Sequence, residues 1–144
     1  MKNLIRLLAL SLFFPIAAQA ELSQKFGDIE VHYNALATSE LRPEIAKNYK
    51  IDSSQNRGLV TISVLKKNNL GVAQPIQAEL GVSAANLNSQ LTNIDMREVR
   101  EGGAIYYLGE YRLSPPDTLK FTVYVKPRGA AASHKVEFQQ KFFR

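Results

Sequence analysis

Apolar and polar residues alternate most clearly in the segment from Glu101 to Leu113. One face of an extended chain there carries four large apolar residues, Ile105, Tyr107, Tyr111 and Leu113. The opposite face begins with Ala104, Tyr106 and Leu108, so the first half of the segment is apolar on both sides. This pattern predicts a strand in the middle of a sheet. Gly102-Gly103 interrupt the chain before it, and Pro115-Pro116 end it because proline cannot donate to a strand ladder.

Six further segments have the patterns of strands. They are Gln24–Thr38, Leu59–Lys66, Gln74–Val82, Gln90–Arg100, Thr118–Lys126 and Lys135–Phe143. Leu59–Lys66 and Gln74–Val82 flank a turn that contains Asn68-Asn69, and we expect them to form a hairpin. Gln90–Arg100 fits neither the strand nor the helix period cleanly. We interpret it as a strand with a bulge, with a short helix as the alternative.

One short helical turn is predicted after Leu41. Pro43 suits the first position of a helix, and Glu44 is favourable at its positive end. Ile45 and Tyr49 would then face inward at a spacing of four. Short strands, turn signals and the lack of crossover helices together predict an all-β fold, an antiparallel immunoglobulin-like β-sandwich of about seven strands.

The first twenty residues have the pattern of a secretory signal peptide. Lys2 and Arg6 precede a short apolar run, and Ala18-Gln19-Ala20 forms a small-x-small cleavage site. We therefore expect export and a single β-sandwich domain over residues 21–144. The chain has no cysteine, so neither a disulfide framework nor a lipid-anchored start is expected. No later apolar run is long enough to span a membrane, and the expected location is the periplasm, as a soluble protein.

The charge balance is mildly basic. The chain has 18 lysines and arginines and 13 acidic residues, and without Lys2 and Arg6 the net charge is +3. Basic residues are concentrated toward the C-terminus, which could meet an acidic partner or simply form a solvated strand face. The weak net charge and the expected compartment argue against a nucleic-acid partner.

Known catalytic patterns are absent from the sequence. It contains no Gly-x-Ser-x-Gly elbow, no phosphate-binding glycine-rich loop and no local pair of histidine ligands. His32, together with Glu30 or Glu101, is the one pairing that could support acid–base chemistry. Asp95, Glu98 and Glu101 would share a helix face and could hold calcium, but they would scatter across both faces of a strand. We expect folding to need no metal and no other cofactor.

The tyrosines are the better candidates for binding. Tyr33, Tyr107 and Tyr111 share a period with aliphatic neighbours and are predicted to be core residues. Tyr106 and Tyr124 fall on the opposite, wetter faces of their strands, where an aromatic ring could contact a partner. The candidate partner-binding residues are therefore Tyr106, Tyr124, His32 and Glu101.

Three blocks carry a resemblance to a known family: FGDIEVHYNA near residue 26, LRPEIAKNYKI from Leu41, and EGGAIYYL from Glu101. Together they resemble an uncharacterised family of short secreted proteobacterial proteins, catalogued only as a domain of unknown function. The resemblance implies an exported immunoglobulin-like sandwich and supplies no catalytic residues. Arg42 departs from the family pattern, which usually has a capping Thr or Ser there.

Three functions remain open from the sequence. The first is a binding or accessory module for a periplasmic protein or another envelope partner, which would add a strand at a sheet edge or rest on Tyr106, Tyr124 and the basic C-terminal strands. The second is a small periplasmic hydrolase or isomerase that uses His32 with a carboxylate. The third is a structural envelope protein without a small ligand. The sequence favours the first over an enzyme.

Overall fold

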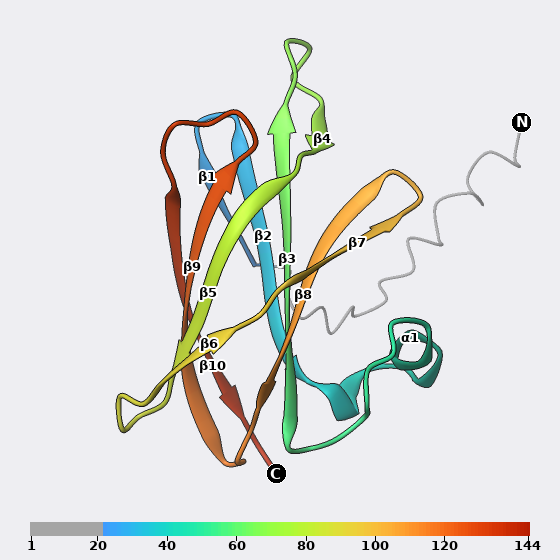
Figure 1. Cartoon of the computed structure of the whole chain (residues 1–144), viewed down its shortest axis with the longest axis vertical. Helices are drawn as coiled ribbons and strands as arrows, with labels where there is room; N and C mark the ends of the chain where they lie inside the picture. The colour runs from blue at the N-terminus through green and yellow to red at the C-terminus, as the bar shows by residue number, and fades with distance from the viewer. Residues whose placement is uncertain (1–21) are drawn as a thin grey trace, which may run out of the picture.

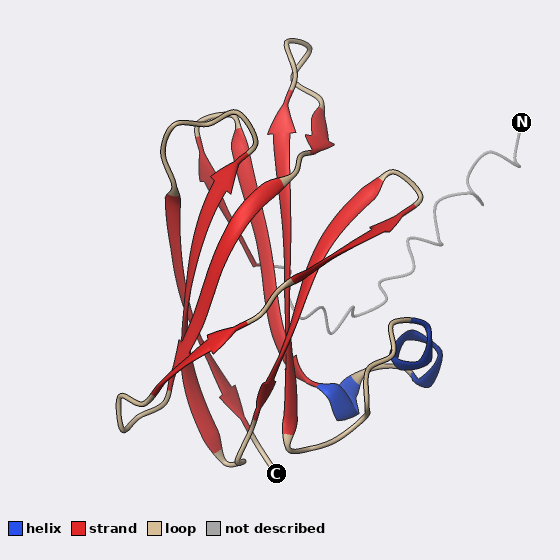
Figure 2. Cartoon of the chain, in the orientation of Figure 1, coloured by secondary structure: helices blue, strands red, loops and turns tan. Residues whose placement is uncertain are grey.

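The computed structural model describes residues 22–144, and the expected signal peptide lies outside them. Within this range the chain forms two antiparallel sheets, with a single short α-helix beside one of them (Figures 1 and 2). The strands are β1 (Leu22–Phe26), β2 (Ile29–Ala37), β3 (Arg57–Lys67), β4 (Ala73–Pro75), β5 (Ala78–Ala85), β6 (Leu91–Ile94), β7 (Arg97–Glu101), β8 (Ala104–Arg112), β9 (Asp117–Pro127) and β10 (His134–Phe142). A 3-10 turn at Thr38–Glu40 precedes the helix α1 (Pro43–Asn48).

The two sheets form a sandwich, as the sequence predicts. Sheet A has the strand order β1-β2-β3-β8-β7, with β4 also paired to β3. Sheet B has the order β10-β9-β5-β6. The strand expected in the middle of a sheet, now β8, lies between β3 and β7, and its first half is apolar on both faces, as predicted.

The core lies between the sheets and consists of the period-two residues of both. Val31, Ile62 and Val64 of sheet A are completely buried against Phe121 and Val123 of sheet B. Aromatic rings link the two layers: Tyr111 packs edge-on against Phe121, and Tyr33 stacks on Phe138. The alternation that the sequence shows in these strands is therefore the alternation between core and surface.

The structure contains ten strands in the described range rather than about seven, because three of the expected strands are each divided in two. Gln24–Thr38 turns at Gly27-Asp28 and forms the β1–β2 hairpin. Gln74–Val82 divides after Pro75: β4 stays beside β3 in sheet A, whereas β5 continues in sheet B. The expected long hairpin between Leu59–Lys66 and Gln74–Val82 is thus reduced to the three residues of β4.

The uncertain segment Gln90–Arg100 is neither a single bulged strand nor a helix. It forms β6 in sheet B and β7 in sheet A, and the chain passes from one sheet to the other at Asp95-Met96. We call these two residues the crossing segment. A change of sheet leaves no clean period in the sequence, because the face that is buried changes along with the sheet.

The region around α1 forms a second, smaller core on the outer face of sheet A. Ile51, Leu59 and Leu108 are buried there, with Leu41 and Tyr49 packed beside them. Within the helix, the buried residue is Ala46, whereas Ile45 is 39% exposed, so the expectation that Ile45 faces inward was wrong. The cap residue Arg42 makes no side-chain capping bond; its guanidinium lies 3.5 Å from Glu44.

None of the helices in residues 22–144 has the length and apolar character needed to cross a bilayer.

Candidate functional site

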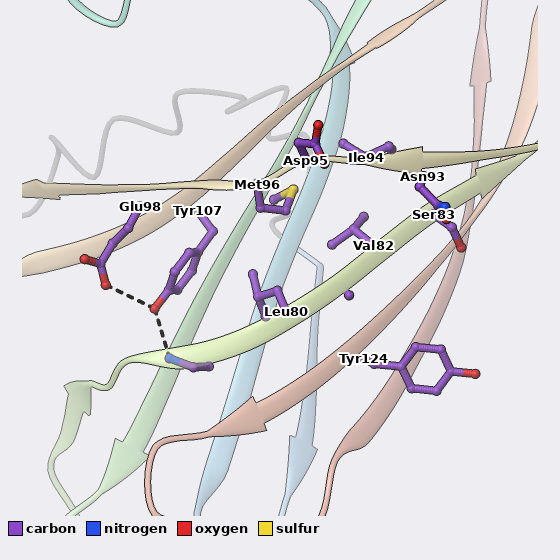
Figure 3. A pocket seen from close by; sticks show the side chains of 12 residues that line it. Leu80, Val82, Ser83, Asn93, Ile94, Asp95, Met96, Glu98, Tyr107 and Tyr124 are labelled. Atoms are coloured by element: carbon purple, nitrogen blue, oxygen red, sulfur yellow. Dashed lines mark hydrogen bonds between the residues drawn. The ribbon is translucent and has the colours of Figure 1, made fainter.

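A cleft opens where one edge of β5 has no strand beside it, although the other edge pairs with β9. β6 pairs with β5 only from Val82 to Ala85, and the chain then departs through the crossing segment toward sheet A. The resulting cavity, here named the β5 cleft, has a volume of about 530 Å³ (Figure 3). It is lined by five residues of β5, by Asn93–Met96, and by Glu98, Tyr107 and Tyr124. This size is typical of pockets that take a small molecule or part of a peptide.

The lining of the β5 cleft combines apolar and polar groups. Leu80 and Val82 point from β5 toward Met96, while Ser83 and Asn93 lie together at the far end (Figure 3). Both faces of β5 contribute, because Tyr124 is paired with Gly81 across the outer face of sheet B. The cleft is therefore built around the open edge of a strand.

A hydrogen-bonded group closes the other end of the cleft. The Tyr107 hydroxyl accepts a bond of 2.9 Å from the backbone N–H of Ala78 and donates one of 3.3 Å to Glu98 (Figure 3). Glu98 also accepts 3.0 Å and 3.5 Å bonds from Gln77 and Arg100. Tyr107 and Glu98 belong to sheet A and Ala78 to sheet B, so this group ties the two sheets together.

The same contacts shift two pKa values in directions that keep the group intact. The hydrogen bond from Gln77 lowers the pKa of Glu98, and Arg100 acts in the same direction. Burial raises the pKa of Tyr107, with the charge of Glu98 acting in the same direction. At neutral pH the pair is therefore a carboxylate and a neutral phenol, which is the combination that the observed bonds require.

Gly109 of β8 makes room for the crossing segment. A Cβ atom at this position would lie 2.4 Å from Met96 Sδ, 2.6 Å from Ile94 Cγ2 and 3.1 Å from the carbonyl oxygen of Asp95. Only a residue without a side chain allows the crossing segment to lie so close to the sheet. Gly109 thus helps to define one wall of the β5 cleft.

The candidates named from the sequence fall in separate places. Tyr124 lines the β5 cleft, and Lys135 lies 5.9 Å from the centre of its ring. Tyr106, which is 38% exposed, lines a different and almost wholly apolar pocket of about 180 Å³ between α1 and the outer face of sheet A. Glu101 lies beside that second region, where it accepts a hydrogen bond from the Tyr49 hydroxyl.

His32 and Glu101 are not brought together. His32 lies on β2, where its Nε2 is 3.1 Å from Glu30 Oε1. Glu101 lies on β7, and because β3 and β8 intervene, the two residues are at least three strand spacings, ~14 Å, apart. Neither His32 nor Glu30 lines the β5 cleft. Of the two pairings suggested for acid–base chemistry, the structure forms only His32 with Glu30.

The carboxylates and histidines considered as metal ligands also do not come together in residues 22–144. Asp95, Glu98 and Glu101 are spread over the crossing segment and β7, and Glu98 and Glu101 fall on opposite faces of that strand. His134 stacks on Phe26, with ring centres 4.5 Å apart, away from His32 on the outer face of sheet A. In residues 22–144 no three His, Asp or Glu side chains gather in a way that could hold a metal ion.

Several residues of the cleft were not identified from the sequence. Leu80 and Met96, and Gly109 behind them, become important through the passage of the chain between sheets, which the sequence does not predict, and Asp95 was considered only as a calcium ligand. A usable signal was the loss of periodicity in Gln90–Arg100, since such a loss next to regular strands indicates that the buried face changes.

The matched family model covers residues 23–144 and is described as a domain of unknown function, DUF4426. The chain belongs to this family. The resemblance seen in the three sequence blocks is thereby confirmed. A search of the curated proteins found no significant match.

Solved structures share the fold of this DUF4426 chain. A DUF4426 family protein from Pseudomonas aeruginosa PAO1 is 31% identical, with a TM-score of 0.73 over 88% of this chain and 97% of that one. A copper-bound variant of FetP from uropathogenic Escherichia coli strain F11 is 11% identical, with a TM-score of 0.62 over 85% of this chain and 95% of that one. FetP of strain F11 in its as-isolated form, expressed recombinantly in the periplasm of E. coli BL21(DE3), gives a TM-score of 0.59 at 10% identity, over 85% of this chain and 93% of that one. At such identities the likeness to FetP concerns the fold.

Proposed function

We propose that this DUF4426 chain is an exported, soluble periplasmic binding module that holds part of an envelope partner in the β5 cleft. The observation that carries the proposal is the open edge of β5 within a cavity of about 530 Å³ that has a mixed apolar and polar lining. Concave sites with convergent polar groups are the usual places of binding. The signal-peptide pattern of residues 1–20 supports the compartment.

Two other functions have less support. An enzyme based on His32 would work from the outer face of sheet A, where Glu30 is its partner and the β5 cleft contributes nothing. FetP was produced in the periplasm and a variant of it binds copper. Copper binding by this chain finds no support among residues 22–144, where His32 and His134 lie on different sheets.

Photo-crosslinking in cells tests the proposal. A photoreactive phenylalanine analogue is introduced at Tyr124, on the rim of the cleft, or at Leu70, which is 87% exposed in the β3–β4 turn and serves as the control. The exported protein should give a discrete adduct from position 124 and none from position 70. Equal adducts from both positions, or an adduct from position 70 alone, would contradict binding in the cleft.

A further inference from the structure

Building on the proposed function, we propose that the partner enters the β5 cleft as an extended peptide segment. The segment pairs with the open edge of β5 and places a cationic side chain beside Asp95. Three independent features of the described residues point to such a ligand: the backbone edge, the two-sided lining and the charge of the cleft.

The backbone edge is the first feature. Residues Ala78–Gly81 pair with β9 on one side, but β6 reaches β5 only at Val82, so the other side has no strand partner in the described range. The Ala78 N–H on that side is bonded to the Tyr107 hydroxyl. Because backbone groups alternate in direction along a strand, the N–H and C=O of Leu80 point the same way, into the cleft. An added strand would bond to Leu80, as in other cases of strand addition to a sheet edge.

The lining suits the alternating side chains of an extended peptide. On the inner side, Leu80 and Met96 offer apolar contact; on the outer side, Gly81 leaves space, since the nearest atom to a Cβ built there is Tyr124 Cβ at 3.9 Å. Successive side chains of a strand point to opposite faces. One residue of the segment would therefore contact apolar groups, and the next would lie over Gly81 beside Tyr124.

The charge of the cleft selects a cationic segment. Asp95 and Glu98 are the charged residues of its lining, which contains no lysine or arginine. Gln77 and Arg100 already bond to Glu98. Asp95 is exposed and forms no ion pair with any residue in 22–144, so its carboxylate is available to a ligand. Without Lys2 and Arg6 the net charge of the chain is +3, so an acidic cleft favours basic ligands locally while the rest of the surface does not.

A peptide titration followed by NMR tests the inference on the mature chain. The probe is the capped pentapeptide acetyl-Thr-Val-Lys-Val-Thr-amide. Two control peptides are used. In the first, Lys is replaced by Glu. In the second, the three central residues carry N-methyl groups, which remove the N–H donors that strand pairing needs. The Lys peptide should shift the amide resonances of Leu80, Gly81 and Asp95 and slow hydrogen exchange at Leu80. The Glu peptide should bind about tenfold more weakly, and the N-methylated peptide should not bind.

A matched pair of variants separates local from general charge effects. Asp95→Asn should weaken the binding of the Lys peptide about fivefold. Asp28→Asn, which makes the same change on the β1–β2 turn, should leave the affinity for the Lys peptide unchanged. If the N-methylated peptide shifts the same resonances as strongly, strand pairing is wrong although cleft binding stands. Equal binding of the Lys and Glu peptides would overturn the charge selection. If no peptide shifts the cleft resonances, the inference fails, and the crosslinking from position 124 decides the proposed function separately.

Discussion

At the scale of single residues, Tyr107 is the clearest case of a side chain with a structural task beside the site. Its ring is buried and its hydroxyl joins Ala78 of sheet B to Glu98 of sheet A. The neighbouring Tyr106 points to the other face and is 38% exposed. The period-two pattern predicted this difference, and the predicted face of each ring is confirmed.

Truncation of the two tyrosines should therefore have unequal effects. Tyr107→Ala should lower the free energy of unfolding by about 3–5 kcal/mol, from lost burial and the cavity left behind. Tyr107→Phe keeps the ring and should cost about 1–2 kcal/mol, since it leaves the Ala78 N–H without its acceptor. Tyr106→Ala should cost clearly less than Tyr107→Ala. Urea denaturation of the three variants beside the wild type measures these differences, and a larger loss for Tyr106→Ala would contradict the assignment.

Glu98 should make stability depend on acid pH. Its pKa is lowered in the folded state, chiefly by the bond from Gln77, so its stabilising contribution is complete above the ordinary carboxyl pKa. That contribution is lost as the pH falls through the folded value. Between about pH 5 and about pH 3, the wild type should therefore lose more stability than Glu98→Gln, and the two curves should converge at the acid end. Glu79→Gln, a control outside this group, should lose stability with falling pH as steeply as the wild type does. An equally steep loss of stability in Glu98→Gln would contradict the role given to Glu98.

At the scale of elements, the passages of the chain between sheets create the cleft. The sequence predicts all seven extended segments, because alternation reports directly which side chains leave water. It does not predict that Gln74–Val82 and Gln90–Arg100 are each shared between two sheets. That division depends on contacts between residues far apart in the chain, such as the pairing of β5 with β9 and the close approach of Met96 to Gly109.

The crossing segment provides a prediction at this scale. Gly109→Ala places a methyl group against Ile94 and Met96 and should destabilise the fold by about 1–3 kcal/mol through overpacking. It should also shift the amide resonances of Asp95 and Met96. Gly103→Ala, where a Cβ meets no atom within 4 Å, is the control and should change neither quantity appreciably. Equal denaturation midpoints for Gly109→Ala and the wild type would show that the segment is not held in this way.

At the scale of the whole molecule, the protein is a two-sheet sandwich, and the proposed binding site lies at the open edge of β5. The core needs no disulfide, since the chain has no cysteine, and it is formed by the fully buried valines, isoleucine and phenylalanine of the two sheets. Of the candidate site, the sequence identified Tyr124 from its position on a wet strand face. Asp95, on the crossing segment, could not be placed in the same cleft until the sheet order was known.

Export is the prediction that concerns the whole chain. Cleavage after Ala20 should give a mature protein that begins at Glu21, because Ala18-Gln19-Ala20 has the small-x-small pattern that the signal peptidase recognises. N-terminal sequencing of the periplasmic fraction of an expressing Gram-negative host reads this directly. A mature protein that still begins at Met1 would rule out the expected processing.

Filling the β5 cleft tests the central claim most directly. Gly81→Trp places a large ring over the outer side of the open edge, where a Cβ is accommodated and the nearest atom is 3.9 Å away. Ser53→Trp puts the same ring on an exposed loop outside the cleft. In cells that carry the photoreactive residue at position 124, the adduct should disappear with Gly81→Trp and persist with Ser53→Trp. An adduct of unchanged yield with Gly81→Trp, in a protein that melts at the wild-type temperature, would contradict binding in the β5 cleft.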